Sequence, residues 1–475
     1  MIRAALTPTI IPWRLPTPDA ESADCAYQCS LAELYAYSET PREAAAIRLG
    51  QTRKLQRMRT LLGLAGSPHA NFQTVLVAGT KGKGSMAALL TSILEAAGFR
   101  VGRYTQPHLY SHRERIWANG DHISESAFVS TLERLRPSLA AIERRVDDLG
   151  PLTTFDVGTA LAIDYFAQER VEIAVVEVGV GGENDATNVL DPILALIGPV
   201  GMDHSETLGS TIGAIARHKA GVMRSGIDVA VSAQQPEAQD VIREVAQDVG
   251  ARLLELGREF RWATSADGGG RFHLGGVFGC LDCLETPLLG RCQRDNAAVA
   301  VAGALALNGR GWSISEDDIR RGLASVSWPG RFQTVVSEPL TVVDGAHNPP
   351  SMKALAETVR ECLPGRPISL VIGMSVEKDV AASMAELAPL VDCVVATRSR
   401  HPRSCDPERI AAIAKDLDLA VRIVSDPGDA VAVSWSGQWP DGATLVAGSL
   451  FLAGDVLEWL QRGGAGRGES AYDAS

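Results

Sequence analysis

The chain has 475 residues, of which 45% are hydrophobic and 21% charged, a length that suggests two or three domains with cores of their own. It has 45 Lys and Arg residues against 57 Asp and Glu, a formal net charge of −12, which makes it a poor candidate for non-specific nucleic-acid binding. Apolar runs fall short of the roughly 18 residues that a membrane span needs, prolines at 8, 12 and 16 interrupt any secretory signal, and eight cysteines are too sparse for a disulfide scaffold. We therefore expect a cytoplasmic protein without nucleic-acid or membrane partners.

The first part of the chain is irregular and then helical. Residues 1–38 are rich in Pro and Ala near their start and are interpreted as an irregular N-terminal lead-in. Residues 39–66 carry apolar side chains at helical spacing. A strand at 74–78 then passes through a glycine-rich turn into a helix that Gly98 is expected to end.

Strand-like and helix-like segments alternate from there to residue 250. Residues 171–178 and 193–197 are near-continuous apolar runs, which is typical of strands covered on both faces. Helical patterns lie near 156–168, 210–224 and 236–250. This alternation predicts a parallel, doubly wound α/β sheet. Residues 252–290 are glycine-rich and are expected to form an antiparallel appendage.

A second alternation begins after the segment Ser327-Trp-Pro-Gly-Arg-Phe332 and predicts a smaller Rossmann-like domain. Its expected strands are 340–343, 368–372, 393–396 and 445–447, and its expected helices are 351–362, 380–387, 407–417 and 453–462. We therefore divide the chain into the lead-in at 1–38, a central domain at 39–328, a C-terminal domain at 329–462 and a flexible tail at 463–475.

The turn after the strand at 74–78 has the composition of a phosphate-binding loop. Its residues are Gly79, Thr80, Lys81, Gly82, Lys83, Gly84 and Ser85. Glycines let backbone N–H groups converge on a phosphate, and the N-terminus of the next helix favours an anion. Lys83 is placed to reach terminal phosphates, and Ser85 to meet a phosphate or a metal. The match to the usual P-loop pattern is imperfect, because Gly84 separates the lysine from the serine. A plain glycine-rich turn is the alternative.

Three polar residues farther along the chain are candidates for the same site. Glu177 ends an apolar strand, where a carboxylate can hold Mg²⁺ against phosphate oxygens, although it could instead cap the glycine turn that follows. His204 follows the next strand and is a weaker candidate, because lone histidines are more often structural. Lys219 lies on the apolar stripe of a helix, a position that costs stability unless the lysine is paired, chemically changed or able to snorkel to the rim.

These motifs occur in an order that resembles the folylpolyglutamate synthase/dihydrofolate synthase family, a branch of the Mur ligase superfamily. Residues 79–85 (GTKGKGS) are similar to the family's GTNGKGS loop, and residues 105–109 (TQPHL) to its SSPHL segment. Residues 177–188 (EVGVGGENDATN) resemble EVGLGGRLDATN. Residues 329–332 (PGRF) and 344–349 (DGAHNP) match two later signatures. The resemblance covers roughly residues 45–460.

The resemblance implies a P-loop, Mur-ligase-like central domain and a monomer with its site between two domains. It implies an ATP-dependent amide ligase that activates a folate or dihydropteroate carboxylate as an acyl phosphate and joins it to L-glutamate. The implied metal ligands, for one or two Mg²⁺ ions, are Ser85, Gln106, Glu177, His204 and Lys219, which is carbamylated in the family. Asn296 and Arg331 would contact ATP, while Asp344 and His347 would close over the nucleotide and the amino acid. Lys83, Lys219, Asp344 and His347 are the implied catalytic residues.

The chain also departs from the family pattern. Lys81 replaces the loop asparagine, and Gln106 replaces a metal-ligating serine. Glu183 and Asn184 replace an Arg-Leu pair in a loop that approaches the pterin in relatives. These departures leave two alternatives open: a related ligase for a carboxylate other than a pteroate, or a degenerate nucleotide-binding protein with a regulatory role. The sequence does not choose between dihydropteroate and folylpolyglutamate as the acceptor.

Overall fold

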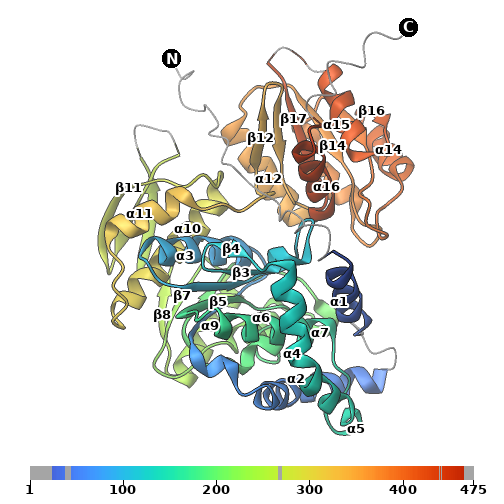
Figure 1. Ribbon diagram of the computed structural model, residues 1–475. Helices are drawn as coiled ribbons and strands as arrows, with labels where there is room; N and C mark the ends of the chain where they lie inside the picture. Colours follow the sequence, from blue (N-terminus) through green and yellow to red (C-terminus); the bar gives the residue numbers. More distant parts are fainter. Residues whose placement is uncertain (1–23, 38–43, 266–269, 438, 440, 465–475) are drawn as a thin grey trace.

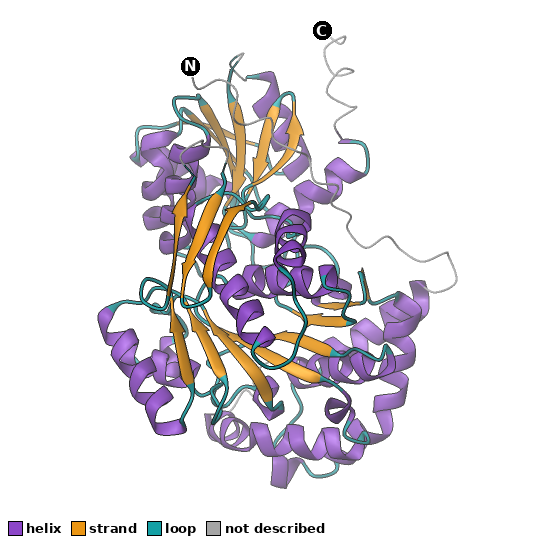
Figure 2. Cartoon of the chain, turned by 90° about the vertical axis from the view of Figure 1, so that its left-hand side faces the viewer, coloured by secondary structure: helices purple, strands orange, loops and turns teal. Residues whose placement is uncertain are grey.

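The computed structural model describes residues 24–37, 44–265, 270–437, 439 and 441–464. The chain forms two lobes, each built around a β-sheet, with the lower lobe in blue to yellow and the upper lobe in orange to red (Figure 1). Figure 2 shows helices on both sides of each sheet. None of the described helices is both long and apolar enough to cross a membrane.

The lower lobe contains an eight-stranded sheet in the order β4-β3-β2-β5-β1-β6-β7-β8. Its strands are β1 Gln73–Ala78, β2 Val101–Tyr104, β3 Ile116–Ala118, β4 Asp121–His122, β5 Ile173–Glu177, β6 Pro192–Ile197, β7 Asp228–Val231 and β8 Arg252–Glu255. The strands from β2 to β8 in this order pair in parallel, and β3 and β4 form an antiparallel edge. Because β1, β5 and β6 are central, their carboxyl ends meet at one edge of the sheet.

Helices cover both faces of this sheet, which confirms the doubly wound class. One face packs against α1 Asp24–Ala36, α2 Ala44–Leu64, α4 Glu125–Glu143, α6 Thr154–Gln168, α8 Ile212–Ala220 and α9 Pro236–Val249. The other packs against α3 Lys83–Ala96, α10 Arg291–Asn308 and α11 Glu316–Ser325. Short helical turns complete the lobe: η1 Pro68–Asn71, η2 His112–Arg115, α5 Val146–Leu149, η3 Ala186–Val189 and α7 Ser205–Leu208.

Two sequence expectations for the lower lobe need correction. The lead-in at 1–38 is not irregular throughout, because residues 24–36 form α1, whose Tyr27, Ser30 and Leu34 are buried on one side of the helix. Residues 1–23 lie outside the described part of the chain. The antiparallel appendage is confirmed as a three-stranded sheet of β9 Phe260–Thr264, β10 Phe272–Gly276 and β11 Gly279–Leu284. The segment before it, β8, belongs instead to the main sheet.

The upper lobe contains a six-stranded sheet in the order β12-β13-β17-β14-β15-β16, parallel except for β12. Its strands are β12 Gln333–Ser337, β13 Leu340–Val343, β14 Ile368–Ile372, β15 Cys393–Ala396, β16 Ala420–Ile423 and β17 Ala443–Ala447. Its helices are α12 Pro349–Cys362, α13 Val380–Leu387, η4 Ala388–Leu390, α14 Pro407–Asp416, α15 Pro427–Ser436 and α16 Leu450–Gln461. The domain boundaries stay predictions, and residues 465–475 of the expected tail lie outside the described residues.

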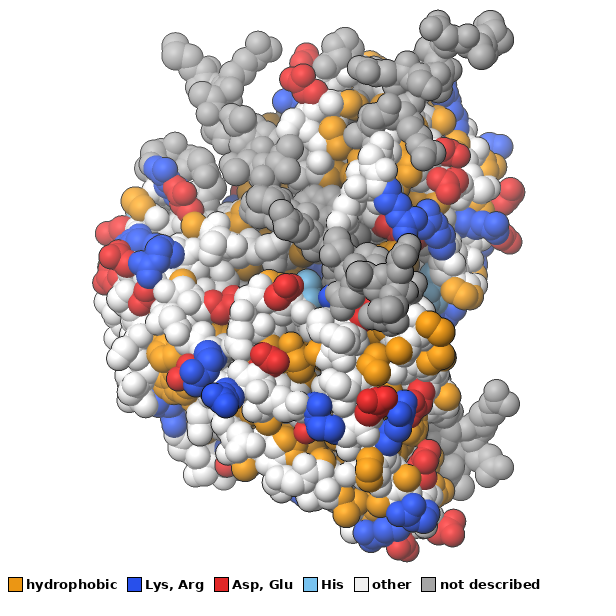
Figure 3. All heavy atoms as spheres, viewed as in Figure 1, with side chains coloured by type: hydrophobic (Ala, Val, Ile, Leu, Met, Phe, Trp, Pro, Cys, Tyr) orange, Lys and Arg blue, Asp and Glu red, His pale blue; other side chains and the backbone are white. Residues whose placement is uncertain are grey.

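The two lobes meet along the segment that follows α11. Gly345, after β13, donates its backbone N–H to the carbonyl of Gly330, and Asp344 accepts the N–H of Phe332 at 2.8 Å. This linker therefore belongs structurally to both lobes. On the face shown in Figure 3, acidic and basic side chains are interspersed, and histidine side chains are visible where the lobes meet.

Candidate active site

The glycine-rich loop is held between α10 and the linker. Gly82 has φ of +77°, and a Cβ there would lie 2.3 Å from Asn296 Oδ1 on α10. A Cβ on Gly84 would lie 2.7 Å from the Trp328 ring on the linker. Side chains at these two positions would therefore force the loop away from its neighbours. The glycines let the backbone lie directly against both, which places Lys83 and Ser85 at the N-terminus of α3.

A cavity of about 1160 Å³ opens between the lobes around this loop. It is lined by most of the predicted site residues: Thr80, Lys81, Gly82, Lys83, Gly84, Ser85, Gln106, Glu177, His204, Asn296, Arg331, Asp344 and His347. Two predicted residues, Gly79 and Lys219, are not among the described residues that line it. The structure therefore brings together residues from both lobes that lie far apart in the sequence.

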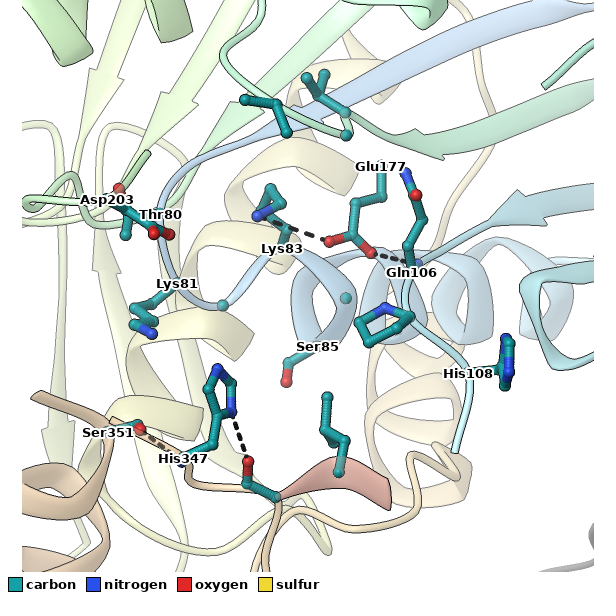
Figure 4. A pocket seen from close by; sticks show the side chains of 18 of the residues that line it. Thr80, Lys81, Lys83, Ser85, Gln106, His108, Glu177, Asp203, His347 and Ser351 are labelled. Atoms are coloured by element: carbon teal, nitrogen blue, oxygen red, sulfur yellow. Dashed lines mark hydrogen bonds and ion pairs between the residues drawn. The ribbon is translucent and has the colours of Figure 1, made fainter. Parts of the chain in front are cut away.

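Glu177 and Lys83 form the charged centre of this cavity (Figure 4). Lys83 Nζ lies 3.7 Å from Glu177 Oε1, and Glu177 Oε2 accepts the backbone N–H of Gln106 at 3.0 Å. Glu177 is buried, and this burial raises the pKa of its carboxyl despite the opposing effect of Lys83. A buried carboxylate with one cation nearby can accept a further positive charge, so the arrangement suits a divalent cation beside a phosphate.

Ser85 and Gln106 add polar atoms near that pair. Ser85 is buried at the start of α3 and points into the cavity. The side-chain nitrogen of Gln106 is buried and has no hydrogen-bond partner among the described residues. This N–H group calls for an acceptor, such as a phosphate oxygen, and not for a cation. Separately, the side-chain oxygens of Ser85, Gln106 and Glu177 are the kind of ligand that Mg²⁺ prefers, so this set of residues fits Mg²⁺.

His204 lies at the rim of the cavity. Its backbone is left-handed, with φ of 49°, and its side chain is 52% exposed and 3.8 Å from Asp203. Within the described ranges, no group of three or more His, Cys, Asp or Glu side chains is arranged to hold a metal. The metal-ligand role of His204 therefore stays a prediction.

Lys219 lies behind the loop, in α8. Its side chain is buried, and Nζ donates to the carbonyl of Gly79 at 2.8 Å, so it does not snorkel to the rim. Burial, reinforced by the neighbouring charge of Lys83, lowers the pKa of Lys219 to about 7. The lysine is thus paired with the backbone of the phosphate loop and is partly neutral at physiological pH.

The upper lobe contributes Arg331, Asp344 and His347. The two carboxylate oxygens of Asp344 accept the backbone N–H groups of Phe332 and Ala346, so this residue fixes the linker as well as lining the cavity. His347 Nδ1 lies 2.9 Å from the carbonyl oxygen of Gly345, which can only accept, so the proton is on Nδ1. Burial lowers the pKa of His347 to about 4. Its other ring nitrogen therefore carries a free electron pair at neutral pH.

A further part of the cavity wall, here named the far end, is formed around Lys54 and Arg57, which the sequence patterns did not identify. Lys54 Nζ, on α2, lies 4.9 Å from the centre of the Phe155 ring and 3.7 Å from Asp185. Arg57, one turn along α2, forms a buried pair with Asp156 at 2.7 Å. The spacing of Lys54 and Arg57 on a predicted helix was visible, but their partners are fixed only by tertiary contacts.

Glu183 and Asn184, which differ from the family pattern, lie outside the far end of the cavity. The Glu183 carboxylate is 3.3 Å from His218 Nδ1 on α8 and is 57% exposed. Neither Glu183 nor Asn184 is among the described residues that line the cavity. The charge reversal in this loop therefore leaves the described cavity wall unchanged.

Comparison with known proteins gives a consistent result. Residues 330–450 match the family described as Mur ligase, glutamate ligase domain. The chain is 33% identical to folylpolyglutamate synthase of Lacticaseibacillus casei over 88% of its length and 96% of the relative's. It is 35% identical to dihydrofolate synthase/folylpolyglutamate synthase of Mycobacterium tuberculosis, over 80% of this chain and 82% of the relative.

Solved structures agree with the sequence comparison. Mycobacterium tuberculosis folylpolyglutamate synthase complexed with ADP superposes with a TM-score of 0.83 at 31% identity, covering 92% of this chain and 98% of that one. Escherichia coli FolC in complex with DHPP and ADP superposes with a TM-score of 0.79 at 29% identity, covering 93% of this chain and 99% of that one.

The low pKa of Lys219 predicts a pH-dependent stability. The pKa of Lys219 is about 7 in the folded chain and ~10.4 in the unfolded chain. Between these two pH values the unfolded chain binds more protons than the folded chain, so the free energy of unfolding rises with pH. Lys219→Met removes this dependence. The measured quantity is the free energy of unfolding of Lys219→Met minus that of the parent, in buffer free of carbon dioxide. We expect this difference to fall by about 2 kcal/mol as the pH rises from roughly 6.5 to 8.5, because only the parent gains stability over this range.

Urea denaturation at several pH values measures this difference. The control is Lys353→Met at an exposed lysine of α12, which should leave the profile of the parent unchanged. Parallel profiles for the parent and Lys219→Met would contradict the assignment.

Proposed function

The chain belongs to the folylpolyglutamate synthase/dihydrofolate synthase family, and from this premise we propose how its site acts as an ATP-dependent ligase that joins glutamate to a folate. The observation that carries the proposal is the joint placement of the phosphate loop, Glu177 and His347 around one cavity between the lobes. The N-terminus of α3 and Lys83 supply positive potential there, and the upper lobe supplies a neutral histidine opposite them.

We propose that the triphosphate binds along residues 79–85, with Lys83 on its terminal phosphates. Asn296 and Arg331 would hold the nucleotide from α10 and the linker, and Asp344 would contact it from the upper lobe. Mg²⁺, held by Ser85, Gln106 and Glu177, would neutralise phosphate charge. Orientation and charge neutralisation are the main requirements of phosphoryl transfer, and these residues supply them without a protein nucleophile.

The acceptor carboxylate would attack the γ-phosphorus, so that a C–O–P bond forms and ADP leaves. The amino nitrogen of glutamate would then attack the acyl carbon, and inorganic phosphate would leave as the amide bond forms. The incoming amine must lose a proton before or during this attack. The free ring nitrogen of His347 faces the cavity from the glutamate-ligase lobe, and we assign it the role of accepting a hydrogen bond from the amine and orienting it, because a ring with a pKa of about 4 is too weak a base to remove the proton.

The far end of the cavity supports a folate acceptor. The Phe155 ring and Lys54 offer a flat apolar face beside a cation, and Asp185 lies next to them. The carboxylate of Glu183 is directed to His218 and away from this wall, which weighs against the alternative of a different carboxylate. The intact Lys83–Glu177 pair weighs against a degenerate, purely regulatory protein.

Lys219 is a candidate for carbamylation. Its pKa of about 7 leaves a neutral amine at mildly alkaline pH, and only a neutral amine can attack carbon dioxide. In that step an N–C bond forms and one proton goes to water, which leaves a carbamate with one negative charge. Lys83, which disfavours the Lys219 cation, would attract this anion.

A substrate panel tests the proposed function. The purified chain with ATP, Mg²⁺ and L-glutamate should release phosphate when dihydropteroate or tetrahydrofolate is added, and mass spectrometry should find the acceptor one glutamate heavier. Lys83→Ala should abolish turnover because the terminal phosphates lose their cation, while circular dichroism stays unchanged. A parent chain that releases no phosphate with either acceptor, or an active Lys83→Ala variant, would contradict the assignment.

Carbamylation predicts a carbon signal that depends on one lysine. With ¹³C-labelled bicarbonate at about pH 8, NMR should show a carbamate resonance that disappears in Lys219→Arg and weakens as the pH falls below about 7. Lys219→Ala should also weaken the dependence of activity on Mg²⁺. A resonance retained in Lys219→Arg, or a parent chain without one, would overturn the carbamate proposal.

A further inference from the structure

A second cavity lies beside the active site, at the junction of β2, β3 and the linker. We name it the linker cavity, and it has a volume of about 370 Å³. The residues that define it are Arg103, Trp117, His122, Trp328, Pro329 and Leu450. Pro107, Arg331 and Leu450 line both cavities, so the two are neighbours separated by side chains of the lobe junction. The proposed ligation uses no group that lines the linker cavity alone.

Arg103 is the unusual residue of this cavity. Its side chain is only 6% exposed, and its guanidinium lies between two indole rings, 4.9 Å from the centre of Trp117 and 5.0 Å from that of Trp328. Arg103 Nε is buried with no hydrogen-bond partner among the described residues. A buried guanidinium is normally paired with an acceptor, because an unpaired charge inside a protein is costly. The charge of Glu95 partly compensates the guanidinium, but the Nε–H donor still lacks an acceptor among the described residues.

Two further nitrogen atoms of the cavity wall are in the same state. Trp328 Nε1 and His122 Nδ1 are buried and lack a partner within the described part of the chain. The nearby acids are already engaged: Glu95 accepts Trp117 Nε1 at 2.7 Å, and Glu114 accepts the backbone N–H groups of residues 109–111. Burial and the charges of Arg103 and Arg113 keep the pKa of His122 near 3, so this ring is neutral. Arg103 and Arg331 line the cavity together with Glu114 and Asp121, and both of these carboxylates accept backbone N–H groups.

Pro107, Leu109, Pro329, Leu450 and the indole edges form the apolar part of the wall. Its other polar residues are Thr105, Glu114, Asp121, Ser327 and Arg331. Its volume falls at the lower end of the range for small-molecule sites, roughly 300–1000 Å³. A single inorganic anion would leave these apolar surfaces uncovered, whereas an acid with a compact apolar body would cover them and reach the donors.

We propose that the linker cavity binds a small organic carboxylate, whose oxygens accept from Arg103 and Trp328 and whose apolar body packs on the surrounding Pro, Leu and Trp side chains. The cavity also contacts the phosphate loop through one residue, because Trp328 packs against Gly84. Trp117 contacts Glu95, in the last turn of α3, and Lys83 begins the same helix. The Trp117–Arg103–Trp328 stack thus touches both ends of α3.

An occupant that holds this stack should stabilise the phosphate loop in the conformation seen here. Nucleotide and carboxylate would then favour each other, and the coupling must be reciprocal. This second statement rests on the proposed nucleotide site, whereas carboxylate binding itself does not. The two can therefore fail separately.

Benzoate and benzylamine test the site without nucleotide. They share an apolar ring and differ in charge, so isothermal titration of the full chain should give saturable binding of benzoate and none of benzylamine. Arg103→Met should weaken benzoate binding by at least about tenfold, since it removes the cation but keeps an unbranched chain between the indoles. Arg258→Met, at a 63% exposed arginine of the lower lobe, is the control and should bind as the parent does.

Trp328→Phe keeps an aromatic ring and removes only the Nε1 donor, so it tests the site if Arg103→Met fails to fold. It should weaken benzoate binding several-fold. No benzoate binding by the parent, equal binding of benzylamine, or unchanged affinity in Trp328→Phe would each overturn the proposal.

Titration of ADP with Mg²⁺, with and without saturating benzoate, tests the coupling. We expect benzoate to tighten ADP binding by about threefold or more, with the same factor for benzoate when ADP is saturating. Equal ADP affinities would overturn the coupling. Loss of ADP binding in both conditions would instead contradict the nucleotide site, while benzoate binding alone would still support the linker cavity.

Discussion

The burial of unlike charges at the carboxyl ends of β1 and β5 is the constraint on which the rest of the site depends. Lys83 Nζ and Glu177 Oε1 are 3.7 Å apart. Lys83 is half-buried and Glu177 is buried, and this burial raises the pKa of the Glu177 carboxyl. A pair of this kind contributes little to stability by itself, because desolvation offsets most of the attraction. The pair instead forms a preorganised position where a phosphate and a divalent cation can bind at small reorganisation cost.

The fold supplies this position by letting three elements meet at one loop. The glycines at 82 and 84 allow α10 and the linker to touch the loop backbone, so a change at either lobe reaches Lys83 directly. Asp344 ties the linker to the turn after β13 by accepting two backbone N–H groups. The cavity is consequently shared between the lobes. The lower lobe contributes the phosphate loop, and the upper lobe contributes the neutral His347. Closure of such an interface around substrates would exclude water from the acyl phosphate.

Much of this arrangement could be predicted from the sequence, because the signals were local. Three local patterns each specify a strand or a helix together with the adjoining turn. They are the apolar run before Gly79, the apolar stripe that includes Lys219 and the polar cluster after β13. Other features depended on tertiary contact. The apolar residues of helix α1 are spread around the helix rather than gathered on one face, and its buried side includes Ser30. Strand β16 is a largely exposed edge without an apolar run. The contacts of Lys54 with Phe155, and of Trp328 with Gly84, join segments about 100 and 240 residues apart, and no spacing rule in the sequence predicts such pairs.

The central claim is that a divalent cation and a triphosphate bind together at the Lys83–Glu177 pair. Isothermal titration of ATP into the parent chain and into Glu177→Gln, each with Mg²⁺ or with a chelator, measures this claim directly. The account predicts one ATP per chain, an affinity at least about tenfold higher with Mg²⁺ in the parent, and loss of that difference in Glu177→Gln. An affinity that is the same with and without Mg²⁺ in the parent, or a Mg²⁺ effect fully retained in Glu177→Gln, would contradict it.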